Sequence, residues 1–180
     1  TRVFDYEKSE HNYTLVARVA DEHNFSIEQS FSIQLLDQNE PPFDLNTTAS
    51  LRVLENQPVG TIVVKLTAKD QDEGEHLVYS LVRDRDLIAN EYFTLDENGT
   101  LRTAEVLDFE KNVSLFIRAR VTDKGGLLAK NGFVVEVINL IEDLDGDGTE
   151  DAFDEDIDGD GFSNEEESAY GSDPWDNQFV

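Results

Sequence analysis

Three short segments of this sequence occur twice, and the two copies lie about one hundred residues apart. Each pair keeps its residue types, since Asp5–Glu7 recurs as Asp108–Glu110, Ala17–Asp21 as Ala119–Asp123, and Ile33–Asp37 as Val135–Asn139. The offsets are 103, 102 and 102 residues, which is close to the length of a β-sandwich of about 100 residues. We therefore interpret residues 1–41 as the second half of one unit and residues 42–142 as the whole of the next.

The repeated body contains short apolar segments that end at turn residues, which is typical of β-strands. We expect strands at residues 14–19, 31–36, 61–67, 77–82, 115–121 and 133–138. The dipeptide Asn98-Gly99 predicts a hairpin turn between residues 93–95 and 101–103, and Asn131-Gly132 predicts a second turn. Many short strands without a long helical period predict an all-β sandwich.

The charge of the chain is strongly negative and is concentrated at its C-terminal end. Fourteen basic residues stand against 40 acidic ones, for a formal charge of −26, and 16 of the acids but none of the bases lie in residues 140–180. This sign argues against nucleic-acid binding and against docking on anionic membranes, because both need basic side chains. The absence of cysteine excludes disulfides and cysteine-ligated metals. The sequence also contains no run of about 20 apolar residues, the length that a membrane-spanning helix needs.

The acidic residues of the tail follow the spacing of a calcium-binding loop, and they do so twice. One loop places acids or glycine at positions 1, 3, 5, 6, 9 and 12, and these are Asp143, Asp145, Asp147, Gly148, Asp151 and Asp154. The second loop fills the same positions with Asp156, Asp158, Asp160, Gly161, Asn164 and Glu167. Position 7 would contribute the main-chain carbonyls of Thr149 and Phe162. Ca²⁺ is a hard cation that selects such oxygens, although the same acids could also form a disordered linker.

Five motifs of the body occur in the order found in the cadherin repeat. They are Leu54-Glu55-Asn56, Asp70-Gln71-Asp72, Asp108-Phe109-Glu110, Val121-Thr122-Asp123 and the linker Asp37-Gln38-Asn39-Glu40-Pro41. Residues 1 to about 143 thus resemble tandem cadherin repeats, which implies a cadherin-type Greek-key β-sandwich of immunoglobulin-like topology and Ca²⁺ at the joint between units. At the first joint the resemblance implies these ligands: Asp5, Glu7, Asp37, Asn39 and Glu40 from the partial unit and its linker, and Asp70, Asp72 and Asp123 from the complete unit.

The second joint departs from this pattern. Its lower ligands would be Glu55, Asp108 and Glu110, but its linker reads Asn139-Leu140-Ile141-Glu142-Asp143. Asn139 stands where the first linker has Asp37, and Ile141 stands where it has Asn39. We therefore expect one Ca²⁺ ion at this joint instead of a full set of calcium ions, with Glu142 and Asp143 shared with the tail.

Residues Tyr170-Gly171-Ser172-Asp173-Pro174 close the acidic segment and resemble the ending of a thrombospondin type 3 repeat, especially its bacterial form. The resemblance implies that residues 143–176 are irregular calcium-binding loops, with a short helix from about residue 164 to 169 and a tail at 177–180.

We expect an extracellular or cell-surface module that is not an enzyme. In one hypothesis, Ca²⁺ stiffens the joint between repeats of the same chain and folds the acidic tail, so that the chain acts in homophilic or heterophilic adhesion. A second hypothesis is calcium-dependent binding of a polysaccharide or a protein, as a module attached to a secreted bacterial enzyme or adhesin. Ordinary surface charge is the alternative for any single carboxylate. No nucleophile–base set, phosphate-binding loop or dinucleotide motif favours catalysis.

Overall fold

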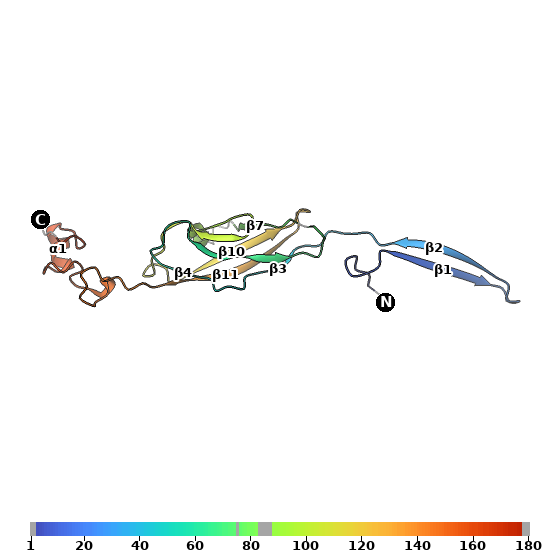
Figure 1. Cartoon of the computed structure of the whole chain (residues 1–180), viewed down its shortest axis with the longest axis horizontal. Helices are drawn as coiled ribbons and strands as arrows, with labels where there is room; N and C mark the ends of the chain where they lie inside the picture. Colours follow the sequence, from blue (N-terminus) through green and yellow to red (C-terminus); the bar gives the residue numbers. More distant parts are fainter. Residues whose placement is uncertain (1–2, 75, 83–87, 178–180) are drawn as a thin grey trace.

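The computed structural model describes residues 3–74, 76–82 and 88–177, and it has three parts in a row (Figure 1). A hairpin of β1 (Asn12–Ala20) and β2 (Ser26–Gln34) comes first. A β-sandwich follows, and an irregular tail with one short helix ends the chain. The N-terminal segment lies beside the joint between hairpin and sandwich, and the tail with its helix lies at the end of the molecule opposite the hairpin.

The larger sheet of the sandwich has the strand order β4-β11-β10-β7. It consists of β4 (Arg52–Leu54), β11 (Leu128–Ile138), β10 (Ser114–Thr122) and β7 (Val78–Leu81). Its neighbours are antiparallel, apart from the parallel pair of β4 and β11. The other strands form the ladder β3-β6 and the sheet β5-β9-β8. Their bounds are Phe43–Asn46 for β3, Thr67–Lys69 for β6, Ile62–Lys65 for β5, Thr100–Thr103 for β9 and Phe93–Leu95 for β8.

One hydrophobic core fills the sandwich, with buried side chains from both layers. Alternation along β10 decides which side chains enter it, because successive residues of a strand point to opposite faces. Leu115, Ile117, Ala119 and Val121 are buried, whereas Phe116 on the opposite face is exposed. The all-β sandwich predicted from the sequence is confirmed.

The hairpin predicted at Asn98-Gly99 is confirmed, since β8 and β9 pair on either side of it. Gly99 has a φ of +89°, and a Cβ atom there would lie 2.5 Å from the carbonyl oxygen of Leu66. Only glycine accepts both the left-handed backbone and this close approach. The strand predicted at residues 61–67 is divided, because β5 ends at Lys65 and β6 begins at Thr67. Strands β3 and β4 were not predicted.

The turn predicted at Asn131-Gly132 is wrong, because both residues lie inside β11, opposite Ala119 and Arg118 of β10. The chain turns earlier, where the amide of Asp123 donates to the carbonyl of Leu127. A Cβ atom at residue 132 would lie 2.6 Å from Cζ of Phe116. Gly132 therefore provides the space for this aromatic ring of the neighbouring strand, which is a tertiary role that the dipeptide alone cannot reveal.

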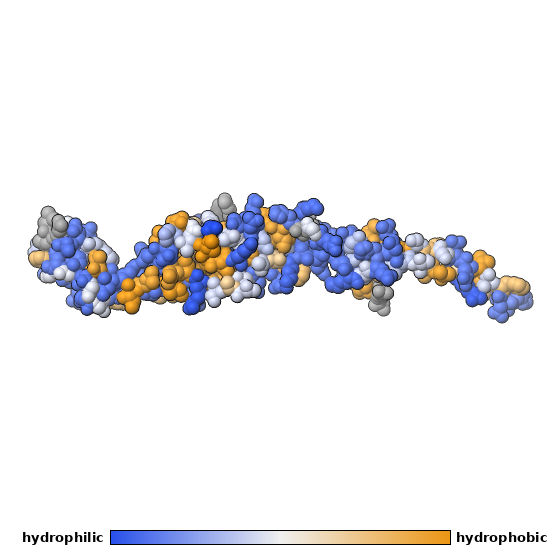
Figure 2. Space-filling model, viewed as in Figure 1, coloured by the Kyte–Doolittle hydropathy of each residue, from blue (hydrophilic) through white to orange (hydrophobic). Residues whose placement is uncertain are grey.

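The β1-β2 hairpin repeats the register of β10 and β11 without a covering sheet. The pairs Leu15–Phe31 and Val19–Ile27 face each other across the two strands and lie on one face of the hairpin. Leu15 and Val19 are 53% and 69% exposed, although Ile117 and Val121, their counterparts in the complete unit, are fully buried. Figure 2 shows such apolar residues in orange along the hairpin.

The tail, as far as residue 177, contains two short helical elements. They are the 3-10 helix η2 (Asp151–Phe153) and the α-helix α1 (Asn164–Tyr170). Ser163 and Glu166 form a capping box at the start of α1, and Gly171 ends it in the left-handed conformation. The predicted short helix is therefore confirmed and extends to Tyr170. Among the described residues, no helix is both long and apolar enough for a membrane span.

Candidate metal centres

The linker after β2 is fixed to two loops at the near end of the sandwich. The Asn39 amide nitrogen donates to the carboxylate of Asp123 at 2.9 Å, and the amide N–H of Glu40 donates to Asp72 at 3.1 Å. Asn39 also packs closely on Gly125, where a Cβ atom would lie 2.3 Å from its Oδ1. These contacts place linker and loop carboxylates side by side at the first joint.

Three carboxylates from three segments meet at this joint. One oxygen each of Glu7, Glu40 and Asp72 lies within 4.8 Å of the others. Desolvation raises the pKa of Glu40, and repulsion from Glu7 and Asp72 adds to the shift. The buried oxygens Oε2 of Glu40, Oδ2 of Asp70 and Oδ1 of Asp72 have no hydrogen-bond partner among the described residues. Such oxygens are costly to bury unless a cation or a proton satisfies them.

The remaining residues predicted for the first joint surround this cluster. Asp37 and Asn39 line a polar pocket together with Glu7 and Asp72. Asp123 is 6% exposed, and besides Asn39 it accepts a hydrogen bond from the Leu127 amide. The pocket thus spans the partial unit, the linker and the sandwich.

Asp5 is held by a lysine of its own loop. Lys8 Nζ lies 2.7 Å from Asp5 Oδ2, and this hydrogen-bonded ammonium lowers the pKa of Asp5. Lys8 also donates to Gln71 Oε1 of the next unit at 2.8 Å. Lys111 repeats the first contact with Asp108 at 2.5 Å. The sequence contains the signal for both, because Asp-aromatic-Glu-Lys occurs in both units, yet our sequence analysis missed it.

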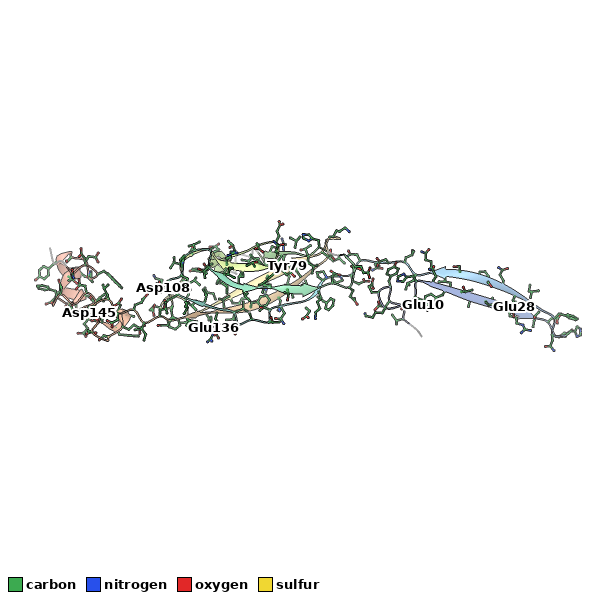
Figure 3. The ribbon with its side chains drawn as sticks, in the orientation of Figure 1. Glu10, Glu28, Tyr79, Asp108, Glu136 and Asp145 are labelled. Carbon is green, nitrogen blue, oxygen red and sulfur yellow. The ribbon has the colours of Figure 1, made fainter. Side chains whose placement is uncertain are left out.

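The second joint contains the predicted lower ligands, close together at the far end of the sandwich. Oxygens of Glu55, Asp108 and Glu110 lie within 4.8 Å of one another, and Figure 3 labels Asp108 at the end that faces the tail. Glu55 is 1% exposed, and its two oxygens accept the amides of Phe109 at 2.6 Å and Leu140 at 2.7 Å.

Charge is crowded around Glu110. The backbone hydrogen bond at Glu110 favours its ionised form, but desolvation and repulsion from Glu55, Glu142 and Asp108 outweigh it and raise the pKa of Glu110. Glu142 of the linker therefore lies close enough to Glu110 to repel it, and its role as a ligand of this joint stays a prediction.

Two amide side chains connect the sandwich to the tail across the second joint. Asn139 Nδ2 donates to Glu110 Oε1 at 3.2 Å and to Glu150 Oε1 at 3.0 Å. Asn56 Nδ2 donates to Glu142 Oε1. Glu150 was not predicted, because position 8 of the loop pattern carries no ligand and only the folded tail brings it to the sandwich.

The first tail loop gathers the carboxylates of Asp143, Asp145 and Asp147 within 4.8 Å. A hydrogen bond from the Asp147 amide favours the ionised form of Asp145, but desolvation and repulsion from Asp147, Asp154 and Asp143 raise its pKa. Asp154, at position 12, keeps a buried Oδ2 with no hydrogen-bond partner in the described part of the chain. Asp151 is 8% exposed, and its Oδ1 accepts the Leu144 amide at 2.8 Å.

The second tail loop gathers Asp156, Asp158 and Asp160 in the same way. Glu167, at position 12, is completely buried, and desolvation and then repulsion from Asp158 raise its pKa. Neither of its carboxylate oxygens has a partner in hydrogen-bonding geometry within residues 3–74, 76–82 and 88–177, although the nearby Ser172 side chain partly opposes the rise of the pKa. A buried carboxylate with two free oxygens at the closing position of this loop fits a hard divalent cation.

The position-9 side chains bond to the backbone of their own loops, and Asn164 also bonds to the backbone of the first loop. Asn164 Oδ1 accepts the Ile157 amide at 3.1 Å, as Asp151 accepts Leu144, and its Nδ2 donates to the Asp154 carbonyl at 2.7 Å. The position-7 amides of Thr149 and Phe162 donate to Asp147 and Asp160. These bonds hold both loops in the curvature that points successive aspartates inward.

Comparison with known proteins finds two family matches along the chain. A family model for the cadherin domain matches residues 49–138, and a model for the bacterial TSP3 repeat matches residues 156–177. Protocadherin alpha-2 of Pan troglodytes and that of Homo sapiens are each 38% identical to the chain over 124 residues. This match covers 66% of the chain but 13% of each relative.

Solved structures show the same architecture. Extracellular cadherin domains 1–4 of protocadherin gamma B7 superpose with a TM-score of 0.58 and 27% identity, covering 78% of this chain and 35% of that one. Chicken VE-cadherin EC1-2 gives a TM-score of 0.52 and 27% identity, covering 77% and 71% of the two chains. Because the cadherin model matches half of its residues, the chain belongs to the cadherin family and carries a bacterial TSP3 repeat after its cadherin domain.

Proposed function

We propose that this chain is a non-enzymatic, extracellular adhesion and spacer module in which Ca²⁺ stiffens the joint between repeats and folds the acidic tail. The cadherin relatives support an adhesion-type module at the cell surface. The chain spans about an eighth of the length of the protocadherins that it matches, so its partner, a cell-surface protein of the same or another kind, is part of the proposal.

One observation carries the proposal. Carboxylates of the partial unit, the linker and the sandwich converge at the first joint, and three buried oxygens of that joint lack hydrogen-bond partners among the described residues. Without a cation, Glu7, Glu40 and Asp72 repel one another and favour an open joint. With a cation, all three carboxylates are attracted to the same ion, and this attraction outweighs their mutual repulsion. The angle between the two units is then fixed.

Bound Ca²⁺ would supply two positive charges and accept about six to eight oxygen ligands. We assign the first joint to Asp5, Glu7, Asp37, Asn39, Glu40, Asp70, Asp72 and Asp123. At the second joint Glu55, Asp108, Glu110 and Glu142 would share one ion. The two tail loops would use Asp143, Asp145, Asp147, Thr149, Asp151 and Asp154, and Asp156, Asp158, Asp160, Phe162, Asn164 and Glu167.

Extracellular modules of this kind typically bind Ca²⁺ with dissociation constants of about 10⁻⁴–10⁻³ M. An ion that binds only the folded state stabilises it in proportion to RT ln(1 + [Ca²⁺]/Kd). The proposed sites would therefore respond to the millimolar calcium levels outside cells, so that the rod forms where adhesion takes place.

Native mass spectrometry tests the ion count, and a pair of spin labels tests the first joint. We expect at least three Ca²⁺ ions per chain, one for the first joint and one for each tail loop. Because the chain has no cysteine, cysteines at the exposed Ser32 and Ser114 can be labelled cleanly. The distance between them should have a broad distribution in EDTA and a narrow one at millimolar Ca²⁺.

Asp72→Asn is the matched variant, because it keeps the shape of the side chain and removes one charge of the first joint. We expect it to lose the narrowing of the Ser32–Ser114 distance while the tail still binds its ions. Glu97→Gln changes an exposed turn residue away from the clusters and serves as the control. A folded chain that binds no Ca²⁺ at millimolar concentration would contradict the proposal.

A second candidate function, calcium-dependent polysaccharide binding, rests on the exposed aromatic residues of the tail. Phe153, Tyr170 and Trp175 are 78%, 77% and 57% exposed, and aromatic rings can stack on sugars. Pull-down on insoluble polysaccharides, with Ca²⁺ and with EDTA, separates the two functions. Retention that is lost in Trp175→Ala would favour this second function.

A further inference from the structure

The outer face of the larger sheet carries a cluster of three exposed positive charges. Alternation along β10 turns Arg118 and Arg120 away from the core, and Lys130 of β11 lies directly across from Arg120. Arg120 Nε donates to the neutral Ser80 Oγ at 2.8 Å. None of the three cations forms a salt bridge with a residue that the structure describes. Like charges that face each other across two strands destabilise a sheet, so this arrangement is unfavourable in the isolated chain.

The first unit neutralises the equivalent pair within its own hairpin. An offset of 102 residues equates Arg120 with Arg18 and Lys130 with Glu28. Arg18 and Glu28 face each other across β1 and β2, and their charged groups lie 3.9 Å apart. The second unit keeps the arginine but has a lysine in place of the glutamate. The excess of positive charge is therefore a feature of this unit and is not required by the strand pairing that both units share.

An ion pair and an apolar area border the three cations. Arg52 Nε lies 2.9 Å from Glu136 Oε2, and Figure 3 labels Glu136 on this sheet. These two charges compensate each other. Phe116 and Val134 face each other across β10 and β11, and they are 44% and 52% exposed. We call the following residues the basic face: Phe116, Arg118, Arg120, Lys130 and Val134.

The tail of the same chain has the complementary chemistry. Residues 140–180 contain 16 acids and no base, so the tail stays negative when its loops hold two divalent ions. It also exposes the rings of Phe153 and Trp175. Arginine and lysine bind carboxylates by charge-assisted hydrogen bonds and aromatic rings by cation–π contacts. Five exposed acids of the tail are not among the proposed calcium ligands, and they are Glu155, Glu165, Glu166, Asp173 and Asp176.

The tail of one molecule lies away from the basic face of that molecule. Lys130 precedes the last residue of β11, Ile138, by eight positions, which is about 26 Å along a strand. The tail begins beyond that end and continues away from the sandwich (Figure 1). A second copy can present its tail to the basic face, and the contact is reciprocal when the two rods lie antiparallel.

From this complementarity we infer that the basic face of β10 and β11 is a docking surface for the acidic tail of a second copy of this chain. The inference names a partner for the proposed adhesion module, and it rests on that proposal for the folded state of the tail. Both copies carry a large negative charge. At an ionic strength of about 0.15 M, however, charges more than about 8 Å apart are largely screened, so the groups that face each other decide whether the copies associate.

Sedimentation equilibrium of the whole chain in millimolar Ca²⁺ tests this inference. In about 0.15 M NaCl the unchanged chain should associate in a concentration-dependent way, and about 1 M NaCl should weaken the association by screening. Lys130→Glu gives the second unit the opposite-charge pair of the first, because it places a carboxylate across from Arg120. We expect this variant to raise the dissociation constant at least about fivefold, since each reciprocal contact loses one exposed ion pair.

Two further variants control for charge and identify the docked segment. Lys65→Glu makes the same charge change on β5, in the other layer, and should leave the dissociation constant unchanged. Glu155→Gln combined with Glu165→Gln keeps every proposed calcium ligand and should weaken the association. Circular dichroism melting of Lys130→Glu should show no loss of stability, because the variant replaces a like-charge pair across the strands by an opposite-charge pair.

The inference is overturned if the unchanged chain stays monomeric, which is the outcome expected if an anionic polysaccharide occupies the basic face instead. It is also overturned if Lys130→Glu and Lys65→Glu weaken the association equally, or if the Glu155 and Glu165 variant associates like the unchanged chain. Native mass spectrometry counts the ions in the same samples. A chain that binds calcium but stays monomeric contradicts only this inference, whereas a folded chain that associates as expected without binding calcium contradicts only the proposed function.

Discussion

Two of the glutamates that the structure describes are almost completely buried, and only one of them has hydrogen-bond donors around it. Glu55 is 1% exposed and accepts two backbone amides, so the protein itself satisfies its charge. Glu167 is fully buried, and its oxygens have no hydrogen-bond partner among the described residues. Burial of a charge without a partner is costly. At the scale of single residues, Glu167 is thus the group that most requires a cation or a proton.

Glu167→Gln should have opposite effects with and without calcium. In EDTA the variant should melt at a higher temperature, because it removes a buried charge next to Asp158. With calcium, the affinity of the second tail loop should fall about 10–100-fold, the range found when groups around a metal site are changed. Calorimetry measures the affinity, and Glu165→Gln on the exposed face of the same helix is the control. Equal calcium affinity in the two variants would contradict the assignment.

Lys8 should compete with calcium at the first joint, because its ammonium holds Asp5 and bridges to Gln71. Lys8→Gln removes this competitor, and we expect the calcium concentration that narrows the Ser32–Ser114 distance to fall by up to about fivefold, as for one exposed ion pair. Lys65→Gln, which removes an exposed lysine of β5, controls for net charge. An unchanged midpoint in Lys8→Gln would show that Asp5 is not a ligand.

At the scale of elements, the repeat gives two copies of one hairpin in different surroundings. Strands β1 and β10 have the same alternation, but only β10 has a sheet over its apolar face. The contrast separates the contribution of packing from that of strand pairing, because β1 pairs with β2 in the same register as β10 pairs with β11. A two-stranded hairpin is marginally stable by itself in water.

Ile117→Ala and Leu15→Ala form a matched pair, since the residues are 102 positions apart and occupy equivalent sites. Ile117 is fully buried, so its truncation should lower the free energy of unfolding of the sandwich by about 2–5 kcal/mol. Leu15 is 53% exposed, and its truncation should change that free energy by less than about 0.5 kcal/mol. Urea unfolding followed by circular dichroism measures both values. Similar costs for the two variants would mean that the hairpin face is covered in solution.

At the scale of the whole molecule, the negative charge is distributed along a rod and concentrated at its joints and tail. Burial and neighbouring carboxylates raise the pKa of Glu40 and of Glu167 above the ordinary value of 4.5. A carboxyl group whose pKa is higher in the folded than in the unfolded state stabilises the fold fully at pH values below its unfolded-state pKa. This stabilisation is lost as the pH rises through its folded-state pKa. The hydrogen-bonded ammonium of Lys8 lowers the pKa of Asp5. The stability that the ionised Asp5 carboxylate contributes is therefore lost only as the pH falls below about 3.8.

The melting temperature in EDTA should therefore be lower at pH 7 than at pH 4.5, because the loss of protons from Glu40 and Glu167 above 4.5 removes their contribution to stability. With millimolar calcium the trend should reverse, since ions bind the deprotonated carboxylates and protect the fold more strongly at pH 7. Thermal melts at both pH values, with and without calcium, measure this. An equal change of melting temperature with pH in EDTA and in calcium would show that protons and calcium do not bind the same carboxylates.

Sequence reasoning recovered the repeat, the alternation of β10, the Asn98-Gly99 turn and the carboxylate groups of both tail loops. Each of these depends on residues that are close in the chain or on a fixed spacing, so local geometry is sufficient to predict them. It failed at Asn131-Gly132, because the ring that needs the glycine belongs to Phe116 on another strand. It also missed Glu150, which reaches Asn139 only through the fold of the tail.

The sequence by itself determined which oxygen donors this chain carries, and at what spacing, because loop periodicity and the 102-residue repeat are written in residue order. Only the tertiary structure decided which of these donors share a site, since Glu7, Glu40 and Asp72 come from segments up to 65 residues apart. It also decided that Asn139 bridges two carboxylates instead of facing solvent. The physical reason is that hydrogen bonding and charge repulsion depend on distances of a few ångströms in space, which packing of the sandwich sets.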